Sequence, residues 1–139
     1  MTIQTGKKLK DEKGLILIGT CSQMMDNIQL MGMSFNFYQT VDLSHARELL
    51  IYSIEKYLSS INSDQKIRPY LHEYPFGAKN VEISIHFYNP DGSDVALDKI
   101  YYASAIDGKL SYYVDLPEKY SRKSIHEETY EQALQLEQK

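Results

Sequence analysis

One short stretch of the chain, residues 66–79, carries the side chains that acid–base chemistry and anion binding use. His72 and Glu73 are adjacent there, and Arg68 lies four residues before the histidine. A histidine titrates near neutral pH and can act as a general base, and an arginine can hold an anionic group with two parallel hydrogen bonds. One hypothesis is therefore a small enzyme or ligand-processing domain in which His72 and Glu73 react and Arg68 clamps an anion.

The same stretch also has the composition of a binding loop. Tyr70 and Tyr74 flank the histidine, and tyrosine is enriched in the cores of protein interfaces. We expect these two rings, with Arg68 and His72, to contribute to a binding surface. The alternative is that the loop only covers one end of the core with its apolar side chains, while its charged groups stay in water.

The other histidines are weaker candidates. His86 alternates with apolar residues and shares its strand face with Glu82 and Ser84. His45 and His126 lie in predicted helices, and no Gly-x-Ser-x-Gly sequence provides a nucleophile for them. We expect ordinary polar surface at these positions.

Metal and nucleotide sites lack the spacings that they require. The sequence has no Cys-x-x-Cys, His-Glu-x-x-His or calcium-loop pattern, and its seven glycines form no phosphate-binding loop. Sulfur ligands for reduced copper are the one alternative. These residues are Cys21, Met24, Met25, Met31 and Met33. Methionines that alternate along a strand are typical of core packing, so we predict no metal site and no cofactor.

Composition indicates one ordinary globular domain. The chain has 139 residues, of which 42% are hydrophobic and 24% charged. A net charge of −4 argues against a nucleic-acid partner, and no apolar run approaches the ~20 residues that cross a bilayer. The single Cys21 can form no disulfide within the chain and suits the cytoplasm. A removed signal peptide would leave the same sequence, so export stays an alternative.

Hydrophobic periodicity predicts the elements that must position these residues. Residues 1–13 are polar, and we expect a flexible tail followed by a single domain over 14–139. Residues 15–22 and 31–37 have the short apolar or alternating patterns of two strands. Between residues 43 and 61, apolar side chains recur at steps of three and four, which predicts an amphipathic helix that Asp42 or Ser44 can cap.

The second half of the chain reads mainly as strands. Alternation over 81–87 predicts a half-buried strand. The Asp107–Gly108 pair between two aromatic, β-prone runs predicts a hairpin, because both turn positions need positive φ. Ser124 and Glu127 have the spacing of a capping box, which predicts a last helix that extends to about residue 137.

The order β-β-α-β-β-β-α predicts an α+β fold. We expect a mainly antiparallel sheet of about five strands with the central helix on one face. Tyrosines on adjacent strands, Tyr101 and Tyr112 among them, would give the sheet a tyrosine-rich surface. The leading hypothesis is a non-enzymatic domain that binds a protein partner or small ligand through this surface and the 66–79 loop. An open sheet also has two unpaired edges, so a homodimer is a natural extension.

Overall fold

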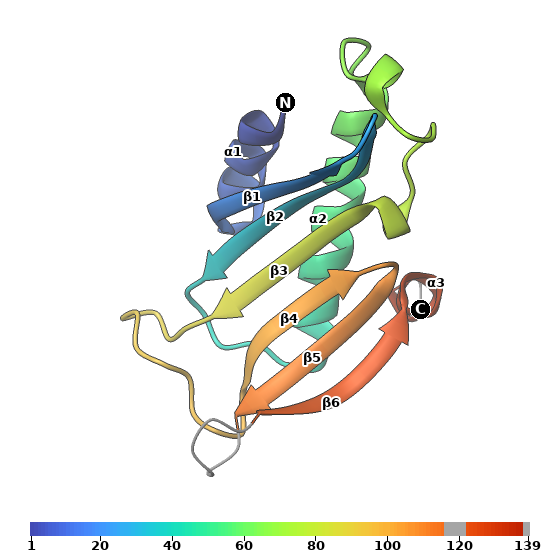
Figure 1. Ribbon diagram of the computed structural model, residues 1–139. Helices are drawn as coiled ribbons and strands as arrows, with labels where there is room; N and C mark the ends of the chain where they lie inside the picture. Colours follow the sequence, from blue (N-terminus) through green and yellow to red (C-terminus); the bar gives the residue numbers. More distant parts are fainter. Residues whose placement is uncertain (116–121, 138–139) are drawn as a thin grey trace.

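The described residues form a six-stranded mixed sheet with three α-helices on one side of it (Figure 1). The computed structural model describes residues 1–115 and 122–137. The strands lie in sequence order across the sheet: β1 (Ile16–Met24), β2 (Ile28–Phe37), β3 (Val81–Phe87), β4 (Ile100–Ile106), β5 (Lys109–Asp115) and β6 (Arg122–Thr129). The helices are α1 (Thr2–Lys13), α2 (Leu43–Ser63) and α3 (Tyr130–Glu137), and two short 3₁₀ turns cover Arg68–Tyr70 and Ala78–Asn80.

The central helix forms as its periodicity predicts. Asp42 caps α2 by accepting a hydrogen bond from the His45 amide at 2.8 Å. The apolar stripe of α2, which includes Leu50 and Ile54, is buried against the sheet. The residues of β3 that point toward α2, such as Ile83 and Ile85, are fully buried as well, so the core lies between this helix and the middle strands.

The sheet differs from the expected one in strand count and in one pairing. The α+β class is confirmed, but the part of the chain that the structure describes forms six strands rather than about five. Four pairings are antiparallel, and β2 and β3 run parallel because α2 returns the chain to the same end of the sheet. The Asp107–Gly108 turn joins β4 to β5, and both residues have the positive φ that the hairpin requires, 53° and 76°.

The sixth strand replaces the first part of the predicted last helix. Residues Arg122–Thr129 pair with β5, and the helix begins only at Tyr130. The spacing of Ser124 and Glu127 is compatible with a capping box, but pairing with β5 satisfies the backbone of a whole strand and buries Glu128 against α2. The local capping pattern was therefore a wrong indication of helix.

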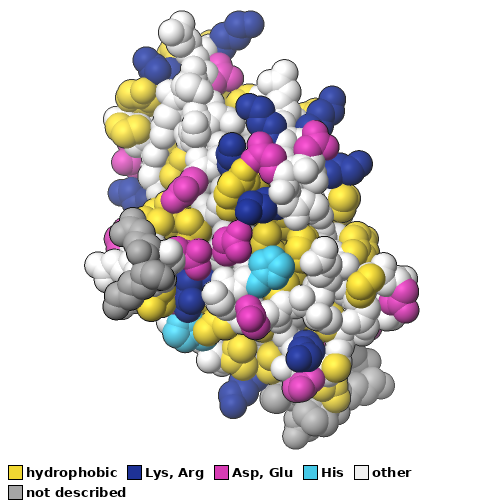
Figure 2. Space-filling model, turned by 180° about the vertical axis from the view of Figure 1, so that it is seen from behind, with side chains coloured by type: hydrophobic (Ala, Val, Ile, Leu, Met, Phe, Trp, Pro, Cys, Tyr) yellow, Lys and Arg dark blue, Asp and Glu magenta, His cyan; other side chains and the backbone are white. Residues whose placement is uncertain are grey.

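The predicted flexible N-terminal tail is also corrected. Residues Thr2–Lys13 form α1, which packs on α2 and β1 and buries Leu9 completely. Gly14 ends this helix in the left-handed conformation, with φ 76°. Only a narrow stripe of α1 is buried, so its many lysines conceal the helical pattern in the sequence. Figure 2 views this helix-covered side and shows acidic and basic side chains interspersed across it.

None of the helices in the described part of the chain combines the length and apolar character that crossing a bilayer requires.

Candidate functional site

The sheet has one covered face and one open face. The three helices lie behind the sheet in Figure 1, and no described helix lies in front of it. Alternation along the strands sends Ile83 and Ile85 toward α2 and sends Ser84 and His86 to the open face. Strand register then shows which side chains of neighbouring strands lie beside these two on the open face.

A band of aromatic rings crosses the open face near the carboxyl ends of β2 and β3. His86, Tyr102 and Tyr113 occupy adjacent register positions, with ring centres 4.7 Å and 5.6 Å apart. The ring centres of Tyr101 and Tyr102 are 6.3 Å apart. Just beyond the ends of β2 and β3, the rings of Tyr38 and Tyr88 stack with their centres 5.7 Å apart. We call the six residues Tyr38, His86, Tyr88, Tyr101, Tyr102 and Tyr113 the aromatic band.

A row of serines runs beside this band across four strands. Its members, in register order, are Ser34, Ser84, Ser104 and Ser111. Ser34 and Ser84 are hydrogen-bonded through their hydroxyls at 2.9 Å. Ser104 and Ser111 are only 3% and 7% exposed, although no described helix covers them. On the open face, aromatic rings and serine side chains therefore lie side by side, and Ser34 and Ser84 are the partly exposed serines.

Charge is sparse at the centre of this face. Glu82 lies on the same face of β3 as Ser84, two residues before it. At the β5–β6 edge, Lys109 forms an ion pair with Glu127, with 2.7 Å between Nζ and Oε2. Both partners of that pair are exposed. The middle of the open face therefore has aromatic and neutral polar character, the composition that interface cores favour.

Among the described residues, His86 on this face has a buried ring nitrogen with incomplete hydrogen bonding. Its Nδ1 atom is buried and has no hydrogen-bond partner among the described residues. Burial lowers the pKa of His86 below its ordinary value, so the imidazole is neutral near pH 7. A neutral imidazole offers one N–H donor and one acceptor nitrogen to whatever contacts it.

The 66–79 loop lies at the other end of the sheet. Leu71 forms a bridge with Ile28 at the start of β2, and the loop leads directly into the start of β3. Because β2 and β3 are parallel, the aromatic band at their carboxyl ends is separated from the loop by the length of β3, about 20 Å at ~3.3 Å per residue. A single small ligand cannot contact both features.

The predicted catalytic side chains of this loop have separate environments. The Arg68 guanidinium lies 4.4 Å from the centre of the Tyr74 ring, and both side chains donate hydrogen bonds to the Asn62 carbonyl. Glu73 instead accepts a hydrogen bond from Asn80 at 2.9 Å. His72 is exposed, as is Tyr70.

The apolar residues of the loop contribute to the core. Leu71 and Phe76 are buried, and the Phe76 amide donates to the Asn62 side chain at 2.8 Å. This matches the alternative in which the loop covers one end of the core. The loop brings Arg68 and Tyr74 together but does not join Arg68, His72 and Glu73 through a shared contact.

Tyr112, which we expected on the exposed tyrosine surface, is fully buried on the helix side. It shares a polar cluster with Arg47, His126 and Glu128. Arg47 donates from Nε and Nη2 to the two Glu128 oxygens at 2.8 and 2.9 Å, and Tyr112 donates to Glu128 Oε2 at 2.7 Å. His126 Nε2 lies 2.9 Å from Glu128 Oε1. The cluster joins α2 to β5 and β6.

The electrostatics of this cluster are those of a satisfied ion pair. Burial opposes ionisation of Glu128, but hydrogen bonds from Arg47, Tyr112 and His126 outweigh it and lower the pKa of this carboxyl. Burial and the adjacent carboxylate raise the pKa of Tyr112. Since each oxygen of Glu128 already accepts hydrogen bonds, we assign the cluster to the stability of the fold.

Sequence reasoning placed tyrosines on the sheet but selected the wrong member of one pair. Tyr113, and not Tyr112, points to the open face, and Tyr102 joins Tyr101 in the band. The alternation of the apolar Leu110 with the polar Ser111 could have shown that even-numbered residues of this strand face the helices, which puts Tyr113 on the open face.

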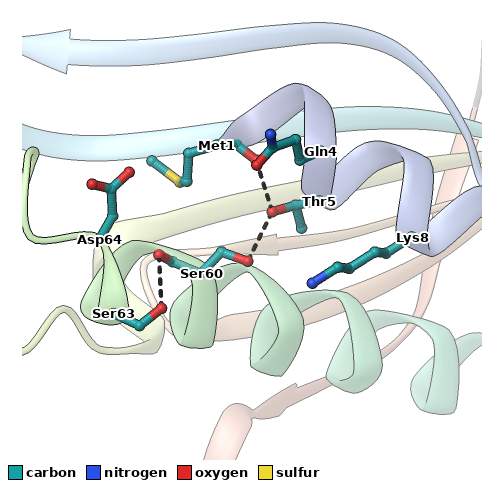
Figure 3. Close-up of a pocket in the computed structure, with 7 residues that line it drawn as sticks. All are labelled: Met1, Gln4, Thr5, Lys8, Ser60, Ser63 and Asp64. Atoms are coloured by element: carbon teal, nitrogen blue, oxygen red, sulfur yellow. Dashed lines mark hydrogen bonds between the residues drawn. The ribbon is translucent and has the colours of Figure 1, made fainter.

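A polar pocket of about 300 Å³ lies between α1 and the end of α2 (Figure 3). Thr5 at its centre contacts the Ser60 hydroxyl at 2.8 Å and the Met1 carbonyl at 3.0 Å. Lys8 and Asp64 lie at opposite ends of the pocket, as Figure 3 shows. Its central hydroxyls bond to each other, so we assign it to the docking of α1.

The described residues do not assemble the sulfur ligands of the alternative copper site. Among the described residues, no three His, Cys, Asp or Glu side chains lie close enough together to hold an ion. Cys21 pairs with Gly32 on the open face, whereas Met33 is buried on the helix side, and Met24 and Met25 are exposed at the β1–β2 turn. The sulfur atoms of Cys21 and Met33 therefore point to opposite faces of the sheet.

Comparisons of the chain with protein-family models, with curated proteins and with solved structures found no match. Function is therefore inferred from the geometry described above.

Proposed function

We propose that the protein is a non-enzymatic binding domain that recognises a protein partner through the open face of its sheet. The observation that carries this proposal is the aromatic band beside the serine row, on a face that no described helix covers. Tyrosine and histidine rings supply large contact areas with few rotatable bonds, and the partly exposed hydroxyls of Ser34 and Ser84 can hydrogen-bond to a partner. A broad face of this kind suits a macromolecular surface better than a small molecule.

Contacts in the 66–79 loop also support a binding domain over an enzyme. A general base must lie within hydrogen-bond reach of the group that it serves, and an anion clamp must face the same space. The guanidinium of Arg68 stacks on Tyr74, while Glu73 contacts Asn80 and Lys79. In this proposal the exposed Tyr70 and His72 form a second contact region at the far end of a large partner.

Ser84→Lys tests the open face, with Ser59→Lys as its matched control. Ser84 lies in the serine row, and Ser59 is exposed on α2. Immobilised wild-type protein is exposed to extract of the source cells, and any retained protein is purified for affinity measurement. We expect a protein that binds wild type and Ser59→Lys equally and binds Ser84→Lys at least about tenfold more weakly, since a buried unpaired charge costs at least ~1.4 kcal/mol. Equal retention by all three proteins contradicts the proposal.

A second mode of association, a homodimer, is favoured by the edge strand β1. Residues 15–25 contain no charged side chain, and Gly19 to Met24 are all exposed. The opposite edge strand, β6, carries Lys123, Glu127 and Glu128. Charges on edge strands prevent pairing with other chains, and β1 lacks them. Antiparallel pairing of β1 with the same strand of a second copy would bring together no like charges.

A further inference from the structure

The outer edge of β1 offers backbone groups to a further strand. In the described sheet β1 pairs with β2 alone, so one side of its backbone has no strand partner. A bulge at Ile18 interrupts the register with β2, which is then continuous from Gly19 to Gln23. All the residues from Ile18 to Met24 are exposed. The stretch Gly19–Gln23 can therefore pair with another extended chain.

The helix α1 lies on β1 and presents one of its sides over this free edge. Gly6 faces β1, because a Cβ atom there would lie 2.8 Å from the Leu17 Cδ2 atom. Thr5 faces α2, where its hydroxyl bonds to Ser60 at 2.8 Å. The side of α1 opposite its α2 contact thus points over the free edge, and the N-terminal end of α1 reaches past β1 in Figure 1.

This side of α1 carries Ile3, Lys7 and Lys10, which share one helix face because they are four and three residues apart. Ile3 is 68% exposed. Both lysines are exposed and form no ion pair with a described residue. Asp11 lies next to Lys7 on the helix surface, on the side that faces solvent rather than β1. We call Ile3, Lys7 and Lys10 the basic side of α1.

We propose that the edge of β1 binds an extended acidic segment of a protein partner, which adds to the sheet as a further strand. Strand addition satisfies the free backbone groups of Gly19–Gln23. Side chains alternate between the two faces of a strand, so every second residue of the segment faces α1. Carboxylates at those positions pair with Lys7 and Lys10, and an apolar side chain covers Ile3.

Charge favours an acidic segment over a second copy of β1 at this edge. Residues 15–25 contain no charged side chain, so a second β1 brings no carboxylate to Lys7 and Lys10. One edge pairs with one strand at a time, and the acidic segment therefore competes with the homodimer. The proposal goes beyond the open-face proposal and does not depend on it, because the edge of β1 and the aromatic band are different surfaces.

The probe is the peptide acetyl-Thr-Glu-Val-Glu-Val-Glu-Thr-amide, whose carboxylates share one face when it is extended. The ¹H–¹⁵N amide signals of the protein are followed during titration at constant ionic strength. One control peptide has lysine for each glutamate. The other has proline for both valines, which keeps the carboxylates but removes amide donors that a strand needs.

We expect saturable shifts of the Gly19–Gln23 signals with the acidic peptide, and binding of each control peptide that is at least about threefold weaker. Equal affinity for either control peptide would overturn the proposal. An acidic peptide that leaves the signals of Gly19–Gln23 in place would overturn it as well.

Lysine variants separate the basic side of α1 from general surface charge. Lys7→Gln combined with Lys10→Gln should weaken binding of the acidic peptide about threefold or more, the effect of losing two exposed ion pairs. Lys8→Gln combined with Lys66→Gln removes the same charge from exposed positions, of which Lys8 lies at the polar pocket between α1 and α2. This control should keep the wild-type affinity. An equal loss in both double variants, or none in the first, refutes the site.

Sedimentation velocity distinguishes the two occupants of the edge. We expect the acidic peptide to lower any dimer fraction of the wild type, since both use the same strand. A dimer that persists when the peptide is saturating would assign the edge to the second copy and contradict the proposal. Because the peptide binds away from Ser84, failure of this proposal and failure of the open-face proposal are distinguishable.

Discussion

Arg47 of α2 and Glu128 of β6 form a bidentate ion pair across 81 positions of sequence, with N–O distances of 2.8 and 2.9 Å. The side chains are 11% and 3% exposed. This pair fixes the last strand of the sheet to the central helix. It thereby holds β5, with Tyr113 and Ser111 on its open side, in register with the rest of the face.

Glu128→Gln should destabilise the fold by about 3 kcal/mol, because it leaves the Arg47 charge buried without its partner. Urea denaturation followed by circular dichroism measures this. Glu127→Gln is the matched control, since Glu127 precedes it in β6 but pairs with Lys109 at the exposed surface. The control should leave the urea midpoint nearly unchanged. Equal stability of both variants would show that the ion pair does not anchor β6.

Acid should weaken the fold through the same carboxyl. The pKa of Glu128 is lowered in the folded state, so the unfolded state binds the proton more readily. The stabilisation is therefore complete above the unfolded pKa of about 4.3 and is lost as pH falls through the lower folded pKa. Urea midpoints of wild type should decline more steeply below that pH than those of Glu128→Gln. Parallel pH profiles of the two proteins would contradict this.

His86 should titrate below the usual histidine pKa of about 6.5, because burial disfavours its charged form. An NMR titration of the imidazole signals measures this directly. Because the unfolded state binds this proton at a higher pH than the folded state does, the free energy of unfolding falls as pH drops from ~6.5 to the folded pKa. His86→Gln should lack this loss. A His86 pKa above that of the urea-unfolded chain would contradict the burial of its ring.

Thr20→Lys should prevent self-association through β1, because a lysine charge on an edge strand opposes strand pairing. Sedimentation velocity over a dilution series measures the effect. Wild type and the matched Thr40→Lys, placed in the exposed segment after β2, should show the same concentration-dependent dimer. A wild-type protein that is monomeric at every concentration would exclude the homodimer.

Leu9→Ala should cost about 2–4 kcal/mol of unfolding free energy, because Leu9 of α1 is fully buried against the core. Leu97→Ala removes the same atoms from a side chain that is 53% exposed and should have little effect. Thermal or urea denaturation compares them. If Leu9→Ala were as stable as Leu97→Ala, α1 would not be docked on the domain.

The parts of the fold that local pattern determines could be predicted from the sequence. The helix from Leu43 was evident because its apolar residues recur at helical steps and Asp42 can cap it. The β4–β5 hairpin was evident because Asp107 and Gly108 suit a turn with positive φ. Both signals depend on residues within one element.

The features that the sequence does not predict, β6 and the exact rings of the open face, depend on contacts between residues far apart in the chain. The pairing of Arg47 with Glu128 leaves no local signal, and the local pattern at Ser124 and Glu127 predicts a helix where β6 forms. The doublet Tyr112–Tyr113 has no contrast between apolar and polar side chains, and an irregularity in register between Ile100 and Tyr102 shifts the phase of β4. The open face could therefore be predicted to be rich in tyrosine, and the alternation of Leu110 with Ser111 places Tyr113 on it, but the rings that β4 presents depend on the register irregularity.

Carbene footprinting of the protein, free and with its purified partner, tests the open-face proposal most directly. The label modifies exposed side chains, and mass spectrometry locates each modification. We predict that the partner reduces labelling of Tyr102 and Ser84 and leaves labelling of Glu55, exposed on α2, unchanged. Protection of Glu55 with undiminished labelling of Tyr102 and Ser84 would place the partner on the helix side and contradict the proposal.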